Sequence, residues 1–299
     1  MNGKTATAMS LMLLAAAMWG FSGFFSREIM GAGFSAYEVT AVRTLLAVVI
    51  LFFILLIFDR GALKLHRRDI PLFVFFGFMK LLTDLTLFIS QESVNLSMSA
   101  TLQMMSPIYV LLITVAFFGS KATHRKILGV VLSLVGCVLV TGVIFEAGSY
   151  STVGILAGMS SGIAYGVYTI GAKISIMRGY TPSGTLFWMF LVSAIVSLFV
   201  ANPLPVLSAA ATDLHMTFDC IGLAVLITLV PYWLQAISMK NLDSNTVNII
   251  GVFEAVVAAL VGFAIYGEVL TALNILGMVL VFGSIILMGE EKDRNPDTV

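Results

Sequence analysis

Long apolar stretches alternate with short polar segments along the whole chain, and this pattern predicts ten membrane-spanning helices. Each stretch has about the ~20 mainly apolar residues that an α-helix needs to cross the hydrocarbon core of a bilayer. The longest connector, 202–218, is too short to hold a folded domain. We therefore expect an all-α integral membrane protein with spans at 7–29, 35–58, 70–90, 96–118, 123–144, 152–174, 183–201, 218–239, 244–266 and 271–288.

Composition supports the same class of protein. Hydrophobic residues make up 59% of the chain, charged residues only 11%, and the mean hydropathy is +1.03. A soluble protein has about a quarter of its residues charged, so the lipid bilayer is the surrounding that suits this chain. The net charge of zero argues against a nucleic-acid partner. The three histidines fall between the apolar stretches, and we predict no metal site and no cofactor.

The distribution of Lys and Arg predicts which side each loop faces, because these residues accumulate on the cytoplasmic side of membrane proteins. With a cytoplasmic N-terminus, the outer ends hold Arg27 alone, and Arg43 and Lys80 lie within spans. We therefore predict a multi-pass protein of the plasma membrane with both termini in the cytoplasm. The thirteen basic residues on the inner side are then Lys4, Arg60, Lys64, Arg67, Arg68, Lys121, Arg125, Lys126, Lys173, Arg178, Lys240, Lys292 and Arg294.

The chain also repeats itself weakly. A shift of 148 residues places Gly119 on Gly267 and overlays 97–129 on 245–277 without a gap. Each half holds five spans, and because five is odd, the second half must enter the membrane from the opposite side. Inverted repeats of this kind are common in secondary transporters, although apolar helices can also resemble one another by chance. We place the two five-helix halves at 1–146 and 147–299.

Four ionisable side chains lie inside the predicted spans, namely Arg43, Lys80, Asp84 and Glu254. A charge at such depth costs ~2.5 kcal/mol or more, so each should face the interior of the bundle or a wet cavity. One interpretation is a structural network, which the i,i+4 spacing of Lys80 and Asp84 suits. The other is a polar site for substrate or protons. Glu254 is the best proton-carrier candidate because its own helix offers no counter-ion, and Arg43 is its companion in a charge network.

Prolines and glycines mark places where the helices should deviate from regularity. Pro107 and Pro231 lie within the fourth and eighth spans, where each removes one backbone hydrogen bond. Broken helices of this kind commonly line transport sites, and a simple packing kink is the alternative. Four glycines at a spacing of four, 154, 158, 162 and 166, predict close approach of another helix to the sixth span.

Several aromatic and polar side chains within the spans complete the candidate site. Aromatic rings deep in a span usually serve packing, but they can also line a pocket for an organic substrate. No HExxH, GxSxG or P-loop motif is present, so we do not expect an enzyme and expect any driving force to come from gradients. The candidate substrate-binding residues are Trp19, Lys80, Asp84, Gln103, Ser106, Tyr165, Tyr168, Tyr232, Trp233 and Asn248.

A set of short motifs recurs in order along the two halves of the chain, namely Trp19-Gly20, Arg43, Ser106-Pro107, Glu254, Gly267-Glu268 and Gly277. On these residues the chain resembles the ten-helix exporters of the drug/metabolite transporter superfamily, the EamA-like family, over about residues 7–288. The resemblance also has departures, because Ala255 replaces the usual proline after Glu254 and Ser120 stands where the first half would have Glu. Lys80 and Asp84 are not part of the family pattern.

The resemblance implies a carrier in the cytoplasmic membrane with a central cavity between its halves. Its relatives export amino acids and similar small metabolites, and proton exchange is a candidate energy source. Two other functions stay open: a carrier of amphipathic drugs or lipids, and a channel or scaffold without carrier activity. The sequence leaves open whether the protein is a monomer or a homodimer.

Overall fold

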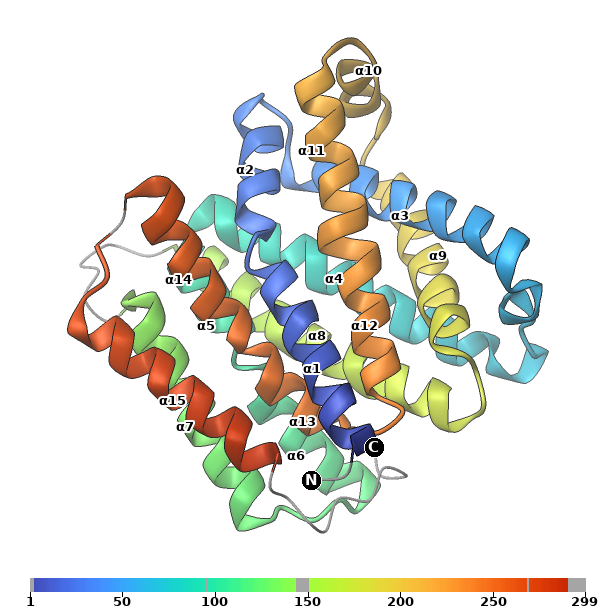
Figure 1. The fold of residues 1–299 in the computed structure, drawn as a ribbon. Coiled ribbons are helices and arrows are strands. Elements are labelled where there is room, and N and C mark those ends of the chain that lie inside the picture. The colour runs from blue at the N-terminus through green and yellow to red at the C-terminus, as the bar shows by residue number, and fades with distance from the viewer. Residues whose placement is uncertain (1–2, 95, 144–150, 268, 290–299) are drawn as a thin grey trace.

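The computed structural model describes residues 3–94, 96–143, 151–267 and 269–289. Every regular element within these residues is helical, and ten helical segments are long and apolar enough to cross a membrane, which confirms the predicted fold class. Figure 1 shows them as one bundle. The spans are α1 (Gly3–Trp19) with α2 (Ser22–Gly31), α3 (Ala36–Phe58), α4 (Ile70–Ser93), α5 (Leu96–Gln103) with α6 (Ser106–Phe118), α7 (His124–Thr141), α8 (Thr152–Met177), α9 (Pro182–Val200), α11 (Leu214–Ala224) with η4 (Val225–Leu229) and α12 (Val230–Ser238), α13 (Ser244–Gly251) with α14 (Phe253–Tyr266), and α15 (Ala272–Gly289).

The connector 202–218 is more ordered than the sequence suggests. It holds the extra helix α10 (Leu204–Thr212), and α11 already begins at Leu214, four residues before the predicted eighth span. Asp213 separates the two helices and caps α11, because its carboxylate accepts a hydrogen bond of 2.8 Å from the backbone N–H of His215. Figure 1 shows α10 beyond the end of α11, at the top of the view.

Four of the ten spans are interrupted. Two interruptions lie next to the prolines at which the sequence predicts a deviation. In the fourth span, α6 begins at Ser106, directly before Pro107. In the eighth span, the π-helical turn η4 ends directly before α12, which contains Pro231. Both predicted deviations are therefore present. The sequence did not predict the other two, at Gly20 in the first span and at Val252 in the ninth.

The fourth and ninth spans share one backbone shape, as the 148-residue repeat predicts. Their breaks at Met104 and Val252 are 148 residues apart. Their second segments, α6 and α14, end at Gly119 and Gly267, which both adopt the left-handed conformation, with φ of +64° and +70°. Each half contributes five spans, so the second runs through the membrane in the opposite direction. The boundary that we place between 146 and 147 lies outside the described residues.

Glycines allow helices of the two halves to approach closely. On α8, a Cβ added at Gly162 would lie 2.9 Å from the backbone oxygen of Leu102 in α5, so the glycine stripe packs against the fourth span as its spacing predicts. A second contact joins α7 and α15, which lie side by side in Figure 1. A Cβ at Gly277 would lie only 2.6 Å from the backbone oxygen of Gly136. Both contacts need glycine because any larger side chain meets main-chain atoms.

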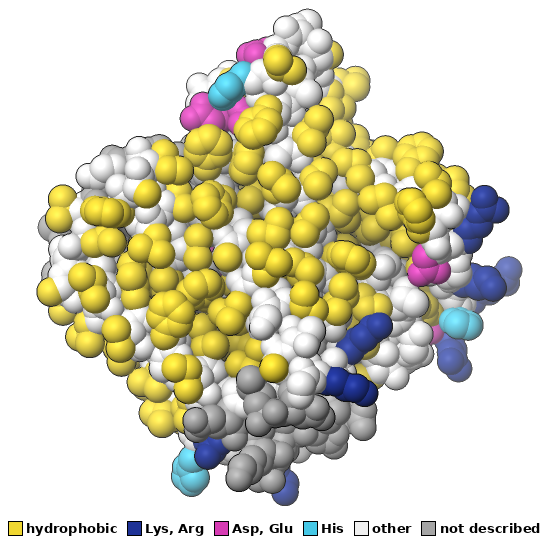
Figure 2. Space-filling view, viewed as in Figure 1, with side chains coloured by type: hydrophobic (Ala, Val, Ile, Leu, Met, Phe, Trp, Pro, Cys, Tyr) yellow, Lys and Arg dark blue, Asp and Glu magenta, His cyan; other side chains and the backbone are white. Residues whose placement is uncertain are grey.

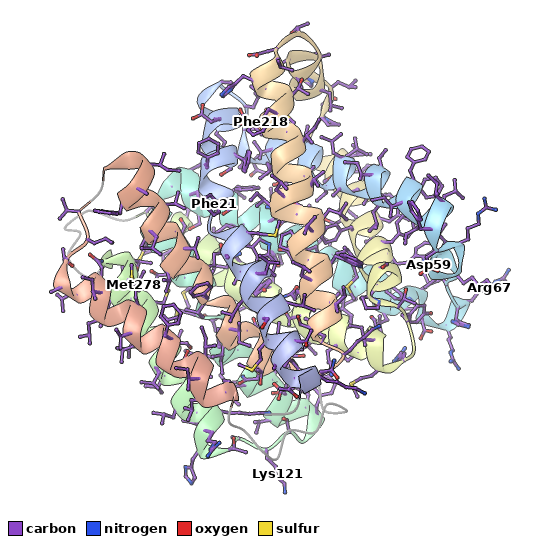
Figure 3. The ribbon with its side chains drawn as sticks, in the orientation of Figure 1. Phe21, Asp59, Arg67, Lys121, Phe218 and Met278 are labelled. Atoms are coloured by element: carbon purple, nitrogen blue, oxygen red, sulfur yellow. The ribbon has the colours of Figure 1, made fainter. Side chains whose placement is uncertain are left out.

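The surface of the bundle is apolar around its sides, and its basic side chains gather at one end. Figure 2 shows hydrophobic side chains over most of the visible face, with Lys and Arg gathered toward the right and bottom and Asp, Glu and His at the top. Figure 3 places Arg67 and Lys121 at this end and Phe218 at the other. We call it the basic end, defined by the loops 59–69, 119–123, 178–181 and 239–243.

Candidate functional site

A cavity of two connected parts lies where the interrupted helices meet. The smaller part, the polar pocket, has a volume of about 40 Å³, and the larger part, the wide cavity, about 330 Å³. The two share lining residues, among them Trp19, Gln103 and Glu254. Nine of the residues singled out from the sequence line the polar pocket: Trp19, Arg43, Asp84, Gln103, Ser106, Tyr165, Tyr232, Asn248 and Glu254.

The wide cavity extends from the polar pocket away from the basic end. Its lining reaches Thr141 at the end of α7, Val269 before α15 and Phe24 in α2. These positions are all at the end of the bundle opposite the basic loops. Small apolar residues of α14, including Ala255, Ala258 and Ala259, form one of its walls. The cavity thus leads from one end of the protein to the polar pocket in its middle.

Asp84, which lines the polar pocket, stands between two cations, one of them outside the pocket. Its Oδ2 accepts a hydrogen bond from Lys80 Nζ, and its Oδ1 lies 3.7 Å from an Arg43 terminal nitrogen. All three side chains are buried, and Lys80 is fully so. The Lys80 ammonium also lies 4.4 Å from the ring centre of Tyr232 and 4.8 Å from that of Phe190. These rings stabilise the cation by their quadrupoles and separate it from the cavity.

Arg43 is held from its other side by the π-helical turn. Its Nε donates a hydrogen bond of 2.6 Å to the hydroxyl of Thr228, which in turn donates to the backbone oxygen of Leu223 at 2.7 Å. Pro231 cannot donate to the carbonyl four residues earlier, and a π-helical turn is one way for a helix to absorb such a gap. The turn therefore fixes the direction of the guanidinium of Arg43.

Aromatic rings form the floor of the polar pocket. The ring centre of Trp19 lies 4.9 Å from that of Tyr232 and 6.2 Å from that of Tyr165, both edge-on. Gln235 donates a hydrogen bond of 2.6 Å to the hydroxyl of Tyr165 and fixes that ring. The indole N–H of Trp19 is buried without a hydrogen-bond partner within the described residues, so it is available to a bound molecule.

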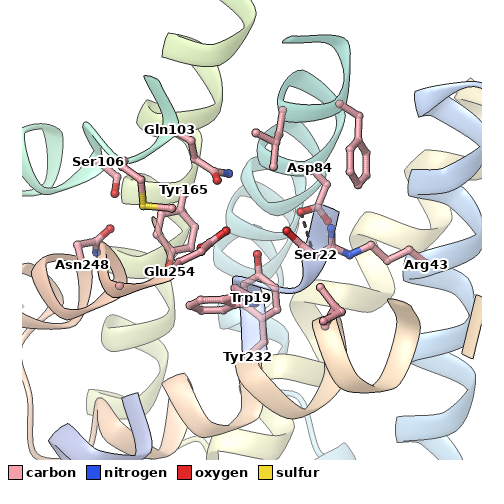
Figure 4. Close-up of a pocket in the computed structure, with 15 residues that line it drawn as sticks. Trp19, Ser22, Arg43, Asp84, Gln103, Ser106, Tyr165, Tyr232, Asn248 and Glu254 are labelled. Atoms are coloured by element: carbon pink, nitrogen blue, oxygen red, sulfur yellow. Dashed lines mark ion pairs between the residues drawn. The ribbon is translucent and has the colours of Figure 1, made fainter. Parts of the chain in front are cut away.

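Glu254 enters the pocket from the break in the ninth span, where it is the second residue of α14. The described residues give its carboxylate no hydrogen bond or ion pair, and Arg43 is the cation that acts on it electrostatically. Figure 4 shows the Glu254 carboxylate and the Arg43 guanidinium pointing toward the centre of the pocket from opposite sides. Asn248, one turn before the break, presents a buried side-chain oxygen without a donor in the described part of the chain.

The structure does not bring every predicted residue to the pocket. Lys80 and Tyr168 lie behind its wall, where the Tyr168 ring packs 5.7 Å from that of Tyr232. Trp233 points away, with 42% of its surface exposed, and donates a hydrogen bond of 2.9 Å to Ser183. The two prolines shape the backbone instead, and the carbonyl of Pro107 accepts a hydrogen bond of 3.2 Å from Asn245.

Other residues of the site were missed from the sequence, chiefly Ser22, Thr228 and Gln235. One signal could have found Thr228, because the 148-residue shift that relates the fourth and ninth spans also places Lys80 on Thr228. Ser22 and Gln235 carry no such signal. Their roles depend on the break at Gly20 and on the contact between α8 and α12.

The arrangement suits reversible binding of a small polar organic molecule. It offers a cation, a carboxylate that is unpaired within the described residues, amide groups and aromatic walls inside a protein whose surface faces lipid. Within the described residues, no group of three or more His, Cys, Asp or Glu side chains is placed to hold a metal ion.

Comparisons with known proteins agree with this description. The model of the EamA-like transporter family matches residues 6–142 and 152–289, one match in each half. An uncharacterised transporter of Archaeoglobus fulgidus is 25% identical over 207 residues, which cover 67% of this chain and 69% of the relative. One of Synechocystis sp. is 29% identical over 224 residues, 72% of this chain and 65% of the relative. A solved crystal structure at 12% identity covers 94% of this chain and 96% of its own with a TM-score of 0.76, and so shares the fold.

Proposed function

Because the chain belongs to the EamA-like transporter family and is a multi-pass membrane transporter, we propose that it exports amino acids or similar small metabolites by alternating access. The main support is one observation. A pocket with both signs of charge lies where the interrupted spans of the two halves meet, at the inner end of a cavity that opens toward one end of the bundle. A zwitterion is the class of molecule whose charges such a pocket complements.

We further propose that the protein lies in the plasma membrane with both termini in the cytoplasm. Basic loops favour the cytoplasmic side, and the described start of α1 and end of α15 lie at the same end as those loops. The wide cavity opens at the opposite end. In this orientation the structure corresponds to an outward-facing state, from which a substrate leaves the cell.

The contacts that close the basic end are of the kind that alternating access requires. Lys126 of α7 and Asp243, before α13, form a largely buried ion pair of 3.1 Å. Asn245 of α13 donates to the carbonyl of Pro107 in α6 at 3.2 Å. Both contacts join the first half to the second, so an inward-facing state needs them to separate. Contacts between polar groups suit a repeated opening better than interlocked apolar side chains do.

Glu254 is the residue to which we assign proton exchange. It is the one acid of the polar pocket without a hydrogen bond or ion pair in the described residues. A carboxyl group in such a place can take up and release a proton as substrate binds and leaves. Asp84 suits this role less because Lys80 holds it as a counter-ion.

Amino-acid counterflow in proteoliposomes tests the proposal. Each of the twenty amino acids is tested singly, with labelled compound outside and the same unlabelled compound inside, on wild type and on Glu254→Gln. Asp219→Asn is the control, since Asp219 is likewise a carboxyl inside a span but lines neither cavity. We expect saturable counterflow in wild type and in the control, and its loss in Glu254→Gln. No counterflow with any amino acid would contradict the substrate class, and flux that does not saturate would indicate a channel.

A second candidate function is a carrier of amphipathic drugs or lipids, which the apolar wall of the wide cavity favours. Ala255, Ala258 and Ala259 leave room beside Phe24 for an apolar group. This function predicts transport that depends on Trp19 and tolerates substitution of Lys80 and Asp84. Efflux of a cationic dye from proteoliposomes, compared between wild type and Asp84→Asn, distinguishes it from amino-acid export.

A further inference from the structure

We propose that Arg43 binds the carboxylate of the transported molecule, and that Lys80 is a positioning residue that prevents Asp84 from neutralising Arg43. The inference rests on the proposed function and assigns the two ends of the substrate to two residues of the pocket. It also gives a role to Lys80, a fully buried cation that does not line the cavity.

The first step is the unequal sharing of Asp84 between its two cations. The Lys80 ammonium donates a hydrogen bond to one carboxylate oxygen. The nearest Arg43 nitrogen lies 3.7 Å from the other, whereas an N–H···O hydrogen bond spans about 2.7–3.2 Å. Asp84 is therefore hydrogen-bonded to Lys80, whereas its contact with Arg43 is a longer ion pair without a hydrogen bond.

The second step is the direction in which the guanidinium group of Arg43 points. Its Nε is used by Thr228 at 2.6 Å, and among the described residues this is the one hydrogen bond that the side chain donates. The ring of Phe88 lies 5.8 Å from the centre of the guanidinium. The terminal nitrogens are left facing the polar pocket, as Figure 4 shows. Arginine offers two parallel N–H groups that match a carboxylate, so this edge is suited to an anion of that shape.

The third step is the charge balance. Lys80 and Asp84 cancel each other, which leaves the positive Arg43 and the negative Glu254 across the pocket. Buried charges need partners, and a zwitterion supplies both at once. Its carboxylate pairs with Arg43, and its ammonium group pairs with Glu254 and the free side-chain oxygen of Asn248. The substrate class is thus an amino acid with both groups free.

Lys80 acts on the substrate only through Asp84 in this arrangement. The rings of Tyr232 and Phe190 lie against its ammonium group, and no part of it lines the pocket. If Lys80 is removed, Asp84 loses its own counter-ion and becomes a competitor for Arg43. A substrate carboxylate would then have to displace Asp84 before it could bind.

The test compares binding of three related molecules to purified protein: L-leucine, 3-methylbutylamine, which lacks the carboxylate, and 4-methylpentanoate, which lacks the amine. Leucine is chosen because Ala255, Ala258 and Ala259 offer room for its side chain. The variants are Lys80→Met, Asp84→Asn and the double variant, and a thermal unfolding scan of each confirms that it is folded. In Lys80→Met, leucine and 4-methylpentanoate should bind ~10-fold or more weakly, the effect of one lost contact to a charged group. The amine should change much less.

The double variant decides between positioning and mere structural support. Removing Lys80 and Asp84 together frees Arg43 again, so affinity for leucine and 4-methylpentanoate should return to within about threefold of wild type, as expected for coupled neighbours. A double variant that stays as weak as Lys80→Met would overturn the role of Lys80. An amine that binds wild type as well as leucine does, or failure of all three molecules to bind, would overturn the assignment of Arg43. Export itself is judged by counterflow with the twenty amino acids and would survive either result.

Discussion

Ser106 and Glu254 occupy equivalent positions in the two halves of the protein. They are 148 residues apart, Ser106 is the first residue of α6 and Glu254 the second of α14, each just after the break of its span, and both line the polar pocket. The two halves therefore present the same backbone feature to the pocket from opposite directions, but only the second half places an ionisable group on it. The backbone around the pocket is therefore symmetric between the two halves, whereas the charge that they contribute is not.

This asymmetry predicts the behaviour of Glu254→Gln. The substitution should lower the initial rate of counterflow at least ~10-fold, because it removes the charge that we assign to the substrate ammonium and to proton exchange. It should leave the thermal unfolding temperature nearly unchanged, since the carboxylate makes no hydrogen bond to the described residues that glutamine would lose. Counterflow at the wild-type rate would show that Glu254 has no part in transport.

Two neighbouring aromatic residues predict opposite outcomes. Tyr232→Leu should strongly reduce counterflow, because the Tyr232 ring contacts Trp19 and covers the Lys80 ammonium. Trp233→Leu should retain a rate within about twofold of wild type, since substitutions at exposed positions usually change free energies by ~0.5 kcal/mol or less. Rates measured per folded protein separate the two effects. An equal loss of counterflow in both variants would mean that the polar pocket is not the transport site.

Gly277 and Gly283 of α15 differ in how closely other atoms approach them, and this difference predicts where an added methyl group destabilises the protein. Gly277→Ala should destabilise the protein by ~1–3 kcal/mol, the usual cost of overpacking, because its Cβ would lie 2.6 Å from main-chain atoms of α7. Gly283→Ala, in the same helix with nothing within 4 Å, is the matched control. Thermal unfolding of both variants in one detergent measures the difference. A control as unstable as Gly277→Ala would point to the backbone rather than to the contact.

The proposed outward-facing state predicts which side reaches the wide cavity. A cysteine at Ala258 should react with a membrane-impermeant thiol reagent from outside the cell, because this residue is exposed and lines that cavity. The natural cysteines, Cys137 and Cys220, are buried and provide a low background. Faster labelling from the cytoplasmic side would reverse the orientation that we propose.

Adding Lys126→Met to the Ala258→Cys protein tests the closure of the basic end. The substitution removes the ion pair with Asp243, so the inward-facing state should become more populated and external labelling should slow. Arg125→Met changes a neighbouring basic residue and serves as the control. Unchanged labelling in the Lys126 variant would show that this ion pair does not hold the end closed.

The ten spans and the repeat could be predicted because they depend on local and periodic properties of the chain. About 20 apolar residues suffice to define a span, and the 148-residue shift reports the repeat directly. The intramembrane charges could be singled out for a similar reason. The bilayer penalises them wherever they face, so their presence alone indicates an interior position.

The tertiary structure alone decided how these residues combine. Lys80 and Asp84 could be paired from their spacing, but the contact of Arg43 with Thr228 joins residues 185 positions apart. The breaks at Gly20 and Val252, the helix α10, and the outward position of Trp233 also depend on packing between distant helices. Hydropathy fixes which segments enter the membrane because lipid treats every apolar side chain alike. The pocket depends on which faces meet, and that is settled by close contacts between helices far apart in the chain.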